Sequence, residues 1–123
     1  MTLRLERLTV AQGGRALIAV DAEATADAPL TLMGPSGAGK SVLLSVVAGA
    51  TPPGFTASGR VLLDGRDLTG LPPEARRIGL MFQDDLLFPH LSVGGNLAFA
   101  LPAAIRGRAA RRARVEAALE AAG

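Results

Sequence analysis

At residues 34–41 the chain reads Gly34-Pro35-Ser36-Gly37-Ala38-Gly39-Lys40-Ser41. The apolar run Leu30-Thr31-Leu32-Met33 precedes this stretch, and Val42 to Ala50 follows it with mostly apolar residues. This order predicts a buried strand, a glycine-rich loop and the start of a helix. Such a loop turns successive backbone N–H groups inward at the positive end of a helix, where they can surround a phosphate chain.

The residue types in the loop fit this chemistry. Glycine at three of its positions allows positive φ or the close approach of phosphate oxygens. Lys40 offers a point charge to β- and γ-phosphates, and the Ser41 hydroxyl can bind Mg²⁺. The predicted cofactor-binding residues are Gly34, Pro35, Ser36, Gly37, Ala38, Gly39, Lys40, Ser41 and Val42. They predict a nucleoside-triphosphate site, but the loop alone does not separate an ATPase from a kinase or a GTPase.

The composition narrows the remaining chemistry. The chain has 123 residues, of which 49% are hydrophobic and only 3% aromatic, so aliphatic side chains must fill the core. The absence of cysteine excludes disulfides and thiolate catalysis within these residues, and a single histidine disfavours a histidine metal cluster. We expect no signal peptide, because charged residues interrupt the first apolar positions.

Basic residues are concentrated near the C-terminal end. Residues 1–105 carry 8 basic and 9 acidic side chains, whereas residues 106–123 carry 5 and 2. The basic residues of this end are Arg106, Arg108, Arg111, Arg112 and Arg114. They suit a solvated helix face, and they could also bind nucleic acid or an anionic membrane surface. Because no aromatic side chains are interleaved for base stacking, we expect no nucleic-acid partner.

Local patterns predict the other elements of the N-terminal part. Residues 3–10 and 16–24 read as strands joined by a turn at Gly13-Gly14. Residues 51–58, rich in proline and glycine, read as a linker. The run Val61 to Asp64 resembles the Mg²⁺-binding strand of P-loop enzymes, but Gly65 and a short polar continuation favour a hairpin instead. A GTPase is disfavoured because Lys40 is the only lysine, which excludes the guanine-reading N-K-x-D motif from this sequence.

Further along, residues 78–82 read as a buried strand ending at Gln83. Ser92 is a plausible N-cap for a helix that reaches Leu101, and Arg108 to Ala122 predict a second helix. The predicted fold class is α/β. It comprises a P-loop core with a mixed sheet, a small antiparallel β subdomain of residues 1–28 and 59–70, and the start of a helical subdomain.

With these segments in place, the chain resembles the nucleotide-binding subunit of ATP-binding-cassette (ABC) transporters. Besides the glycine loop, the resemblance rests on Arg77-Ile78-Gly79-Leu80-Met81-Phe82-Gln83 running into Leu87-Phe88-Pro89-His90-Leu91-Ser92-Val93, with Asn96 beyond. It covers nearly the whole chain and is similar to ATPase subunits of bacterial importers for small solutes. Residues 1–123 are therefore expected to be a partial ABC domain, without the signature, Walker B and switch-histidine regions.

The resemblance also implies roles and partners. ATP and Mg²⁺ are the expected cofactors, with Ser41 and Gln83 as metal ligands and Gln83 orienting the attacking water. Residues 84–92 would contact a transmembrane permease subunit, and a second nucleotide-binding subunit would join in a head-to-tail dimer. The expected location is peripheral, on the cytoplasmic face of the inner membrane.

Two departures and two alternatives accompany this interpretation. No aromatic residue precedes Gly13 for stacking on adenine, and Val42 stands where the family often has a second hydroxyl. We expect weak base selectivity, and no ATP hydrolysis by the isolated 123-residue chain. The alternatives are a soluble P-loop kinase, which the block after Gln83 disfavours, and a non-catalytic nucleotide-binding fragment.

Overall fold

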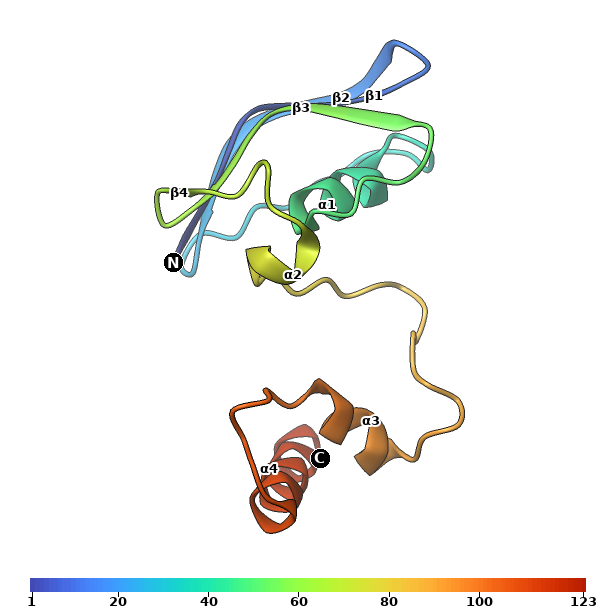
Figure 1. The fold of residues 1–123 in the computed structure, drawn as a ribbon. Coiled ribbons are helices and arrows are strands. Elements are labelled where there is room, and N and C mark those ends of the chain that lie inside the picture. The colour runs from blue at the N-terminus through green and yellow to red at the C-terminus, as the bar shows by residue number, and fades with distance from the viewer. The chain divides into compact units, whose positions relative to one another are not determined.

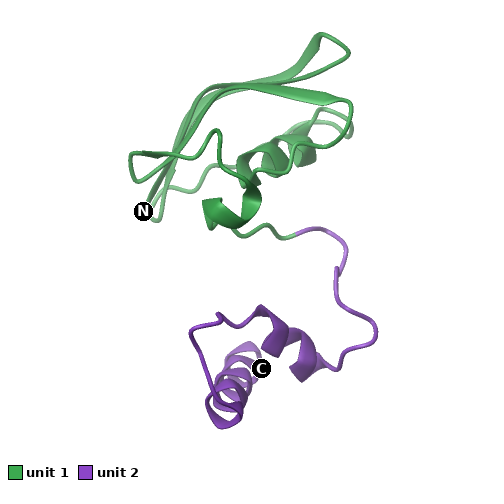
Figure 2. Ribbon diagram, in the orientation of Figure 1, with its two compact units in different colours: residues 1–81 green, residues 82–123 purple.

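An antiparallel sheet dominates the first part of the chain in a computed structural model that describes all residues, 1–123. The chain divides into two compact units, residues 1–81 and 82–123, which are described separately (Figure 2). In the first unit the sheet order is β2-β1-β3-β4. Its strands are β1 (Thr2–Gln12), β2 (Arg15–Thr25), β3 (Phe55–Leu63) and β4 (Arg66–Asp67). This sheet confirms the predicted antiparallel β subdomain.

Two tight turns shape the sheet. Gly13 and Gly14 join β1 to β2, and Asp64 and Gly65 join β3 to β4. Asp64 and Gly65 both have positive φ, at 50° and 77°, as a two-residue hairpin turn requires. The hairpin predicted after Val61 is thereby confirmed.

Helix α1 (Lys40–Ala48) covers one face of the sheet (Figure 1). Its buried side chains pack with strand residues into a single aliphatic core: Leu5, Leu8, Val10, Leu43, Val46, Val47 and Val61. Gly49 ends the helix in the left-handed conformation, with φ of 93°, as expected of a glycine at this position. Because burial of an aliphatic side chain contributes roughly 1.5–3 kcal/mol, this core fixes the helix and the loop in front of it on the sheet.

A bulge in β1 creates the tightest backbone approach of the unit. The pairing of β1 with β3 shifts between Glu6 and Thr9, and Arg7 has a φ of 45°. Gly59 of β3 lies opposite with a φ of 99°, and a Cβ there would stand 2.4 Å from the Arg7 carbonyl oxygen. Only glycine fits this position without moving the backbone.

The buried Arg76 ties helix α2 (Pro73–Arg76) to α1. Its guanidinium donates to the carbonyl oxygens of Leu71, Val46, Val47 and Thr69 at 2.8–3.1 Å. Burial lowers its pKa from the usual value, although the nearby Asp67 charge opposes this shift. The cation also lies at the C-terminal end of α1, where the helix dipole favours positive charge.

Three predictions for the first unit were wrong. Residues 30–33 and 78–82 form no strand, because neither segment has a hydrogen-bonded neighbour. Met33 and Met81 are 90% and 94% exposed rather than buried. The mixed sheet expected for the P-loop core is consequently absent from residues 1–123, whose one sheet is antiparallel.

The expected linker at residues 51–58 is also shorter than predicted. Strand β3 already begins at Phe55, and residues 55–58 pair with residues 9–12 of β1. The turn is confined to the proline and glycine residues before Phe55. The backbone of residues 55–58 gains partners in β1, and this pairing overrides the polar, loop-like composition of the segment.

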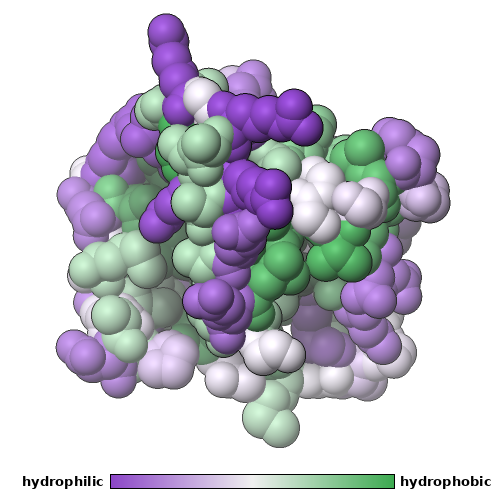
Figure 3. Space-filling view, turned by 90° about the horizontal axis from the view of Figure 1, so that it is seen from below, coloured by the Kyte–Doolittle hydropathy of each residue, from purple (hydrophilic) through white to green (hydrophobic).

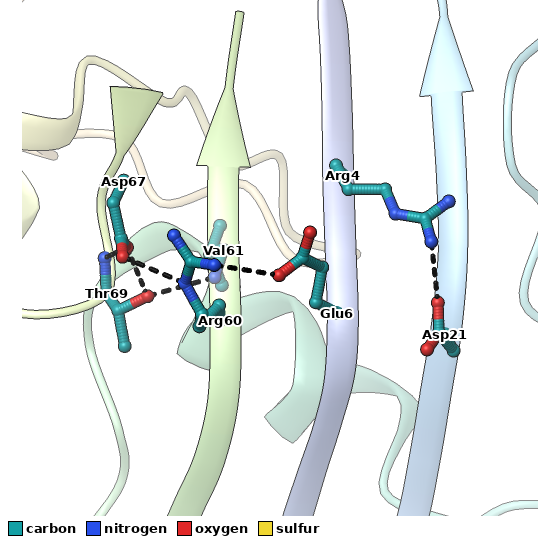
Figure 4. A network of polar contacts seen from close by, with 7 residues as sticks. All are labelled: Arg4, Glu6, Asp21, Arg60, Val61, Asp67 and Thr69. Atoms are coloured by element: carbon teal, nitrogen blue, oxygen red, sulfur yellow. Dashed lines mark hydrogen bonds and ion pairs between the residues drawn. The ribbon is translucent and has the colours of Figure 1, made fainter. Parts of the chain in front are cut away.

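Charged side chains form a network on the sheet (Figure 4). Arg60 bridges Glu6 and Asp67, each at 3.1 Å, and Arg4 pairs with Asp21 at 3.1 Å. Asp67 also accepts bonds from the Thr69 hydroxyl and backbone N–H at 2.5 and 2.9 Å. These Thr69 bonds, followed by Arg60, lower the pKa of Asp67 to about 2.

The network predicts a pH-dependent contribution to stability. Since the folded-state pKa of Asp67 lies below its ordinary value of 3.8, its contribution to stability is fully present above pH 3.8 and disappears as the pH falls towards 2. Asp67→Asn should therefore lower the melting temperature at pH 6, and the gap to the unmodified chain should narrow near pH 2.5. Circular-dichroism melts at both pH values check this. Asp27→Asn is the control, because Asp27 makes no hydrogen bond or ion pair, and an Asp67→Asn gap that is equal at both pH values would contradict the prediction.

The second unit is a pair of helices, α3 (Val93–Ala100) and α4 (Arg108–Ala122). Ser92 caps α3 by accepting a hydrogen bond from the Gly95 N–H at 3.0 Å, which confirms the predicted N-cap. Arg111 of α4 donates to the Ala98 carbonyl oxygen at 2.6 Å. This bond holds the end of α3 against α4.

Candidate functional site

The glycine loop lies between the end of β2 and the start of α1, in the first unit. Strand β2 supports it, because a Cβ on Gly39 would stand 3.4 Å from Ile18 Cγ2 and 3.6 Å from Leu17 Cβ. Ser36 and Gly37 are exposed at its tip. The loop is thus held at its base by the sheet and by α1, while its tip is open to solvent.

The backbone of the loop takes up positive φ at two of its three glycines. Gly37 and Gly39 have φ values of 81° and 89°, whereas Gly34 does not have positive φ. A Cβ on Gly34 would make only an ordinary contact, 3.6 Å from the Ala38 Cβ. Positive φ, which glycine allows, is therefore found at two of the three glycines.

Free backbone donors gather at the start of α1. The Leu43 N–H bonds the Gly39 carbonyl oxygen at 2.8 Å and begins the helical pattern. The N–H groups of residues 39–42 precede that pattern and have no backbone acceptor. They are the donors that an anionic group would engage at the positive end of the helix.

Lys40 folds over the loop. Its Nζ donates to the carbonyl oxygens of Gly34 and Pro35 at 2.6 and 2.7 Å. An ammonium group has three N–H donors, so one remains for a ligand oxygen. The lysine is thereby positioned by the loop and keeps a donor for a phosphate.

Ser41 and Val42 occupy the first turn of α1. The Ser41 side chain is exposed and makes no hydrogen bond, so its hydroxyl is free to bind a cation. Val42 contributes a backbone N–H, and it packs against the aliphatic core. Both residues lie in the helix that was predicted to start directly after the glycine loop.

Gln83 belongs to the second unit, whereas Lys40 and Ser41 belong to the first. It is exposed, with no hydrogen bond, and does not end a strand as predicted. The same segment contains Asp84 and Asp85, which are exposed as well. The role of Gln83 towards a bound nucleotide stays a prediction.

Asn96 organises the loop in front of α3, a role that sequence reasoning did not assign. Its Nδ2 donates to the carbonyl oxygens of Phe88, Leu91 and Ser92 at 3.0–3.3 Å, and its Oδ1 accepts from the Phe88 N–H at 2.9 Å. In the sequence, Asn96 stood out only as a member of the block that resembles the ABC family, four residues after Ser92. The bonds fix the conformation of residues 88–92.

Apolar residues of this loop and of both helices border a groove of about 420 Å³ within the second unit. They include Leu87, Phe88, Pro89, Leu91, Val93, Leu97 and Leu119. Phe88 stacks edge-to-face on Phe99 at 4.7 Å, and Val93 and Leu87 are 70% and 65% exposed. Hydrophobic patches between hydrophilic side chains are visible on the face in Figure 3. An exposed apolar area of this kind is a candidate interaction surface.

The amino-acid sequence of this chain is similar to those of known proteins. A family model described as "ABC transporter" matches residues 17–123. The thiamine import ATP-binding protein ThiQ of Cereibacter sphaeroides is 46% identical over 121 residues, which are 98% of this chain and 51% of that protein. The Fe(3+) ions import ATP-binding protein FbpC of Streptomyces avermitilis is 48% identical over 102 residues, 82% of this chain and 29% of that protein.

The spermidine/putrescine import ATP-binding protein PotA of Methylococcus capsulatus is 51% identical over 90 residues, 73% of this chain and 23% of that protein. The chain thus spans about half the length, or less, of these relatives. None of its helices combines the length and apolar character needed to cross a bilayer. Since the family model covers most of the sequence, the chain belongs to the ABC transporter family.

Proposed function

We propose that the chain is the N-terminal part of an ATP-binding subunit that drives solute import across a membrane. The arrangement of Lys40 carries this proposal, because two of its donors are bound to the loop and one is left, while the N–H groups of residues 39–42 have no backbone acceptor. The names of the import relatives support the choice of import. On this proposal, residues 1–123 are a partial ABC-type nucleotide-binding domain.

In this proposal the loop holds the phosphates of ATP. The N–H groups of residues 39–42 donate to phosphate oxygens, and the ammonium group of Lys40 neutralises part of their charge. Ser41 and Gln83 would hold Mg²⁺, which would neutralise further charge on the phosphates. Gln83 would orient the attacking water. It is not assigned the role of general base, because a neutral amide is a poor base. Hydrolysis is proposed for the whole protein.

The proposed partners follow from the second unit. The apolar groove beside residues 84–92 would receive a transmembrane permease subunit, because its exposed leucine and phenylalanine side chains gain by leaving water. A second nucleotide-binding subunit would complete a head-to-tail dimer. The assembly would be peripheral, on the cytoplasmic face of the inner membrane.

Titration with labelled Mg·ATP tests the nucleotide site. Lys40→Ala should weaken binding at least about tenfold, because it removes a charge-assisted hydrogen bond and no other lysine can replace it. Arg66→Ala is the matched control: it also removes one positive charge, but from an exposed side chain of β4 that makes no hydrogen bond. Unchanged affinity in Lys40→Ala, with measurable binding by the unmodified chain, would remove the loop from the proposal.

A further inference from the structure

Five arginines lie within nine residues at the start of α4 and just before it. These are Arg106, Arg108, Arg111, Arg112 and Arg114, called the arginine patch below. All except Arg111 are exposed. No acidic residue occurs in the first turn of the helix.

This placement works against helix stability. Positive charge near a helix N-terminus opposes the helix dipole, and Arg108 and Arg112 are like charges at the unfavourable i,i+4 spacing. Gly107 precedes the helix without a side-chain cap. The concentration of positive charge at this end therefore does not stabilise the helix, which favours a role in recognition for the arginines that make no hydrogen bond or ion pair within the unit.

Two of the five arginines are engaged inside the unit. Arg111 donates to the carbonyl oxygens of Ala98 and Ile105 at 2.6 and 3.0 Å, and Arg112 pairs with Glu116 at 2.8 Å. The other three arginines, Arg106, Arg108 and Arg114, make no hydrogen bond or ion pair. Their charges are free to meet an external anion.

The patch borders a hollow of about 780 Å³ in the second unit. Arg108, Arg111 and Arg112 line it on the α4 side, and the small residues Ser92, Gly94, Gly95 and Ala98 line it on the α3 side. No carboxylate takes part in this lining. Arg108 is the lining arginine that makes no hydrogen bond or ion pair within the unit, and the hollow is open and large enough for a phosphate-bearing headgroup.

We propose that the arginine patch binds the anionic phospholipid headgroups of a bilayer surface. Basic side chains near such a surface are attracted by its negative potential. Nucleic acid fits less well, because residues 100–123 contain no aromatic side chain on which a base could stack. The patch also lies in the unit that carries residues 84–92, the proposed contact with a membrane protein. This binding goes beyond the proposed function, since it needs neither nucleotide nor permease.

Vesicle co-sedimentation of the full chain without ATP tests the proposal. We expect binding to phosphatidylcholine vesicles that contain phosphatidylglycerol, none to phosphatidylcholine alone, and weaker binding in high salt. Replacement of Arg106, Arg108 and Arg114 by Gln should reduce the partition coefficient by on the order of 100-fold, at about fivefold per arginine. Helix content from circular dichroism verifies that the variant is folded.

The control variant replaces Arg7, Arg15 and Arg66 by Gln, which removes the same charge from exposed side chains of the first unit. It should retain most of the binding. An equal loss in both variants, or no loss in the patch variant, overturns the proposal. Tighter binding to a short DNA duplex that displaces the vesicles would also overturn it, in favour of nucleic acid. None of these outcomes affects the test of the nucleotide site.

Discussion

Arg76→Met is expected to lower the free energy of unfolding by about 3–5 kcal/mol, the cost typical of breaking a buried charged network. Arg76 is 7% exposed, and its guanidinium donates to four carbonyl oxygens. Methionine fills a similar length but leaves the carbonyl groups of Val46 and Val47 without their arginine donor. Urea unfolding followed by circular dichroism measures the change.

Arg76→Lys separates charge from geometry. Lysine keeps the cation, but its compact ammonium cannot reproduce the planar fork of the guanidinium. We expect it to recover only part of the loss. Arg66→Met, at an exposed position, should change stability by less than about 0.5 kcal/mol. Full stability in Arg76→Lys would show that charge alone matters at this site.

Gly59→Ala should be the most damaging single-methyl change in the sheet. The added Cβ would stand 2.4 and 2.7 Å from the carbonyl oxygen and carbon of Arg7, and 2.7 Å from the Glu6 carbonyl oxygen. Glu6 is paired with Arg60 of β3, so its carbonyl group cannot move away without disturbing that pairing. Together with the positive φ, the clash should cost about 3–5 kcal/mol and lower the melting temperature steeply.

Gly65→Ala is the matched control for this prediction. Gly65 also has positive φ, at 77°, but no atom lies within 4 Å of its added Cβ. It should lose only the conformational part, about 1 kcal/mol. Equal losses in the two variants would show that the bulge yields to the methyl group, and would refute the close approach as the cause.

The elements that the sequence predicts well are those with local causes. The Asp64-Gly65 turn, the Ser92 cap and the helix of residues 108–122 each depend on residues close together in the chain. Turn geometry and capping require no distant partner, so their sequence signals are sufficient.

The elements that were missed depend on distant partners. Residues 30–33 and 78–82 have the composition of strands, but a strand also needs a neighbour, and none pairs with them. The burial of Arg76 has the same origin, since its four acceptors lie 5 to 30 residues away and no local pattern reveals them.

In the candidate site, too, features that depend on consecutive residues were predicted, and one that depends on the folded backbone was not. The loop around Lys40 could be read from spacing alone, because its donors come from consecutive residues. Asn96 could not, because its value lies in four backbone partners that its own side chain gathers into one turn. The residue type alone does not predict which backbone groups an asparagine in a helix will bind.

The hydrogen bonds of Asn96 also link the movement of the loop to that of α3. The side chain of Asn96 connects the backbone at Phe88, Leu91 and Ser92 to the first turn of α3 by hydrogen bonds, so that loop and helix are joined directly. Residues 82–87, by contrast, make no hydrogen bonds. A displacement of Phe88 would therefore act on the first turn of α3 through the Asn96 side chain.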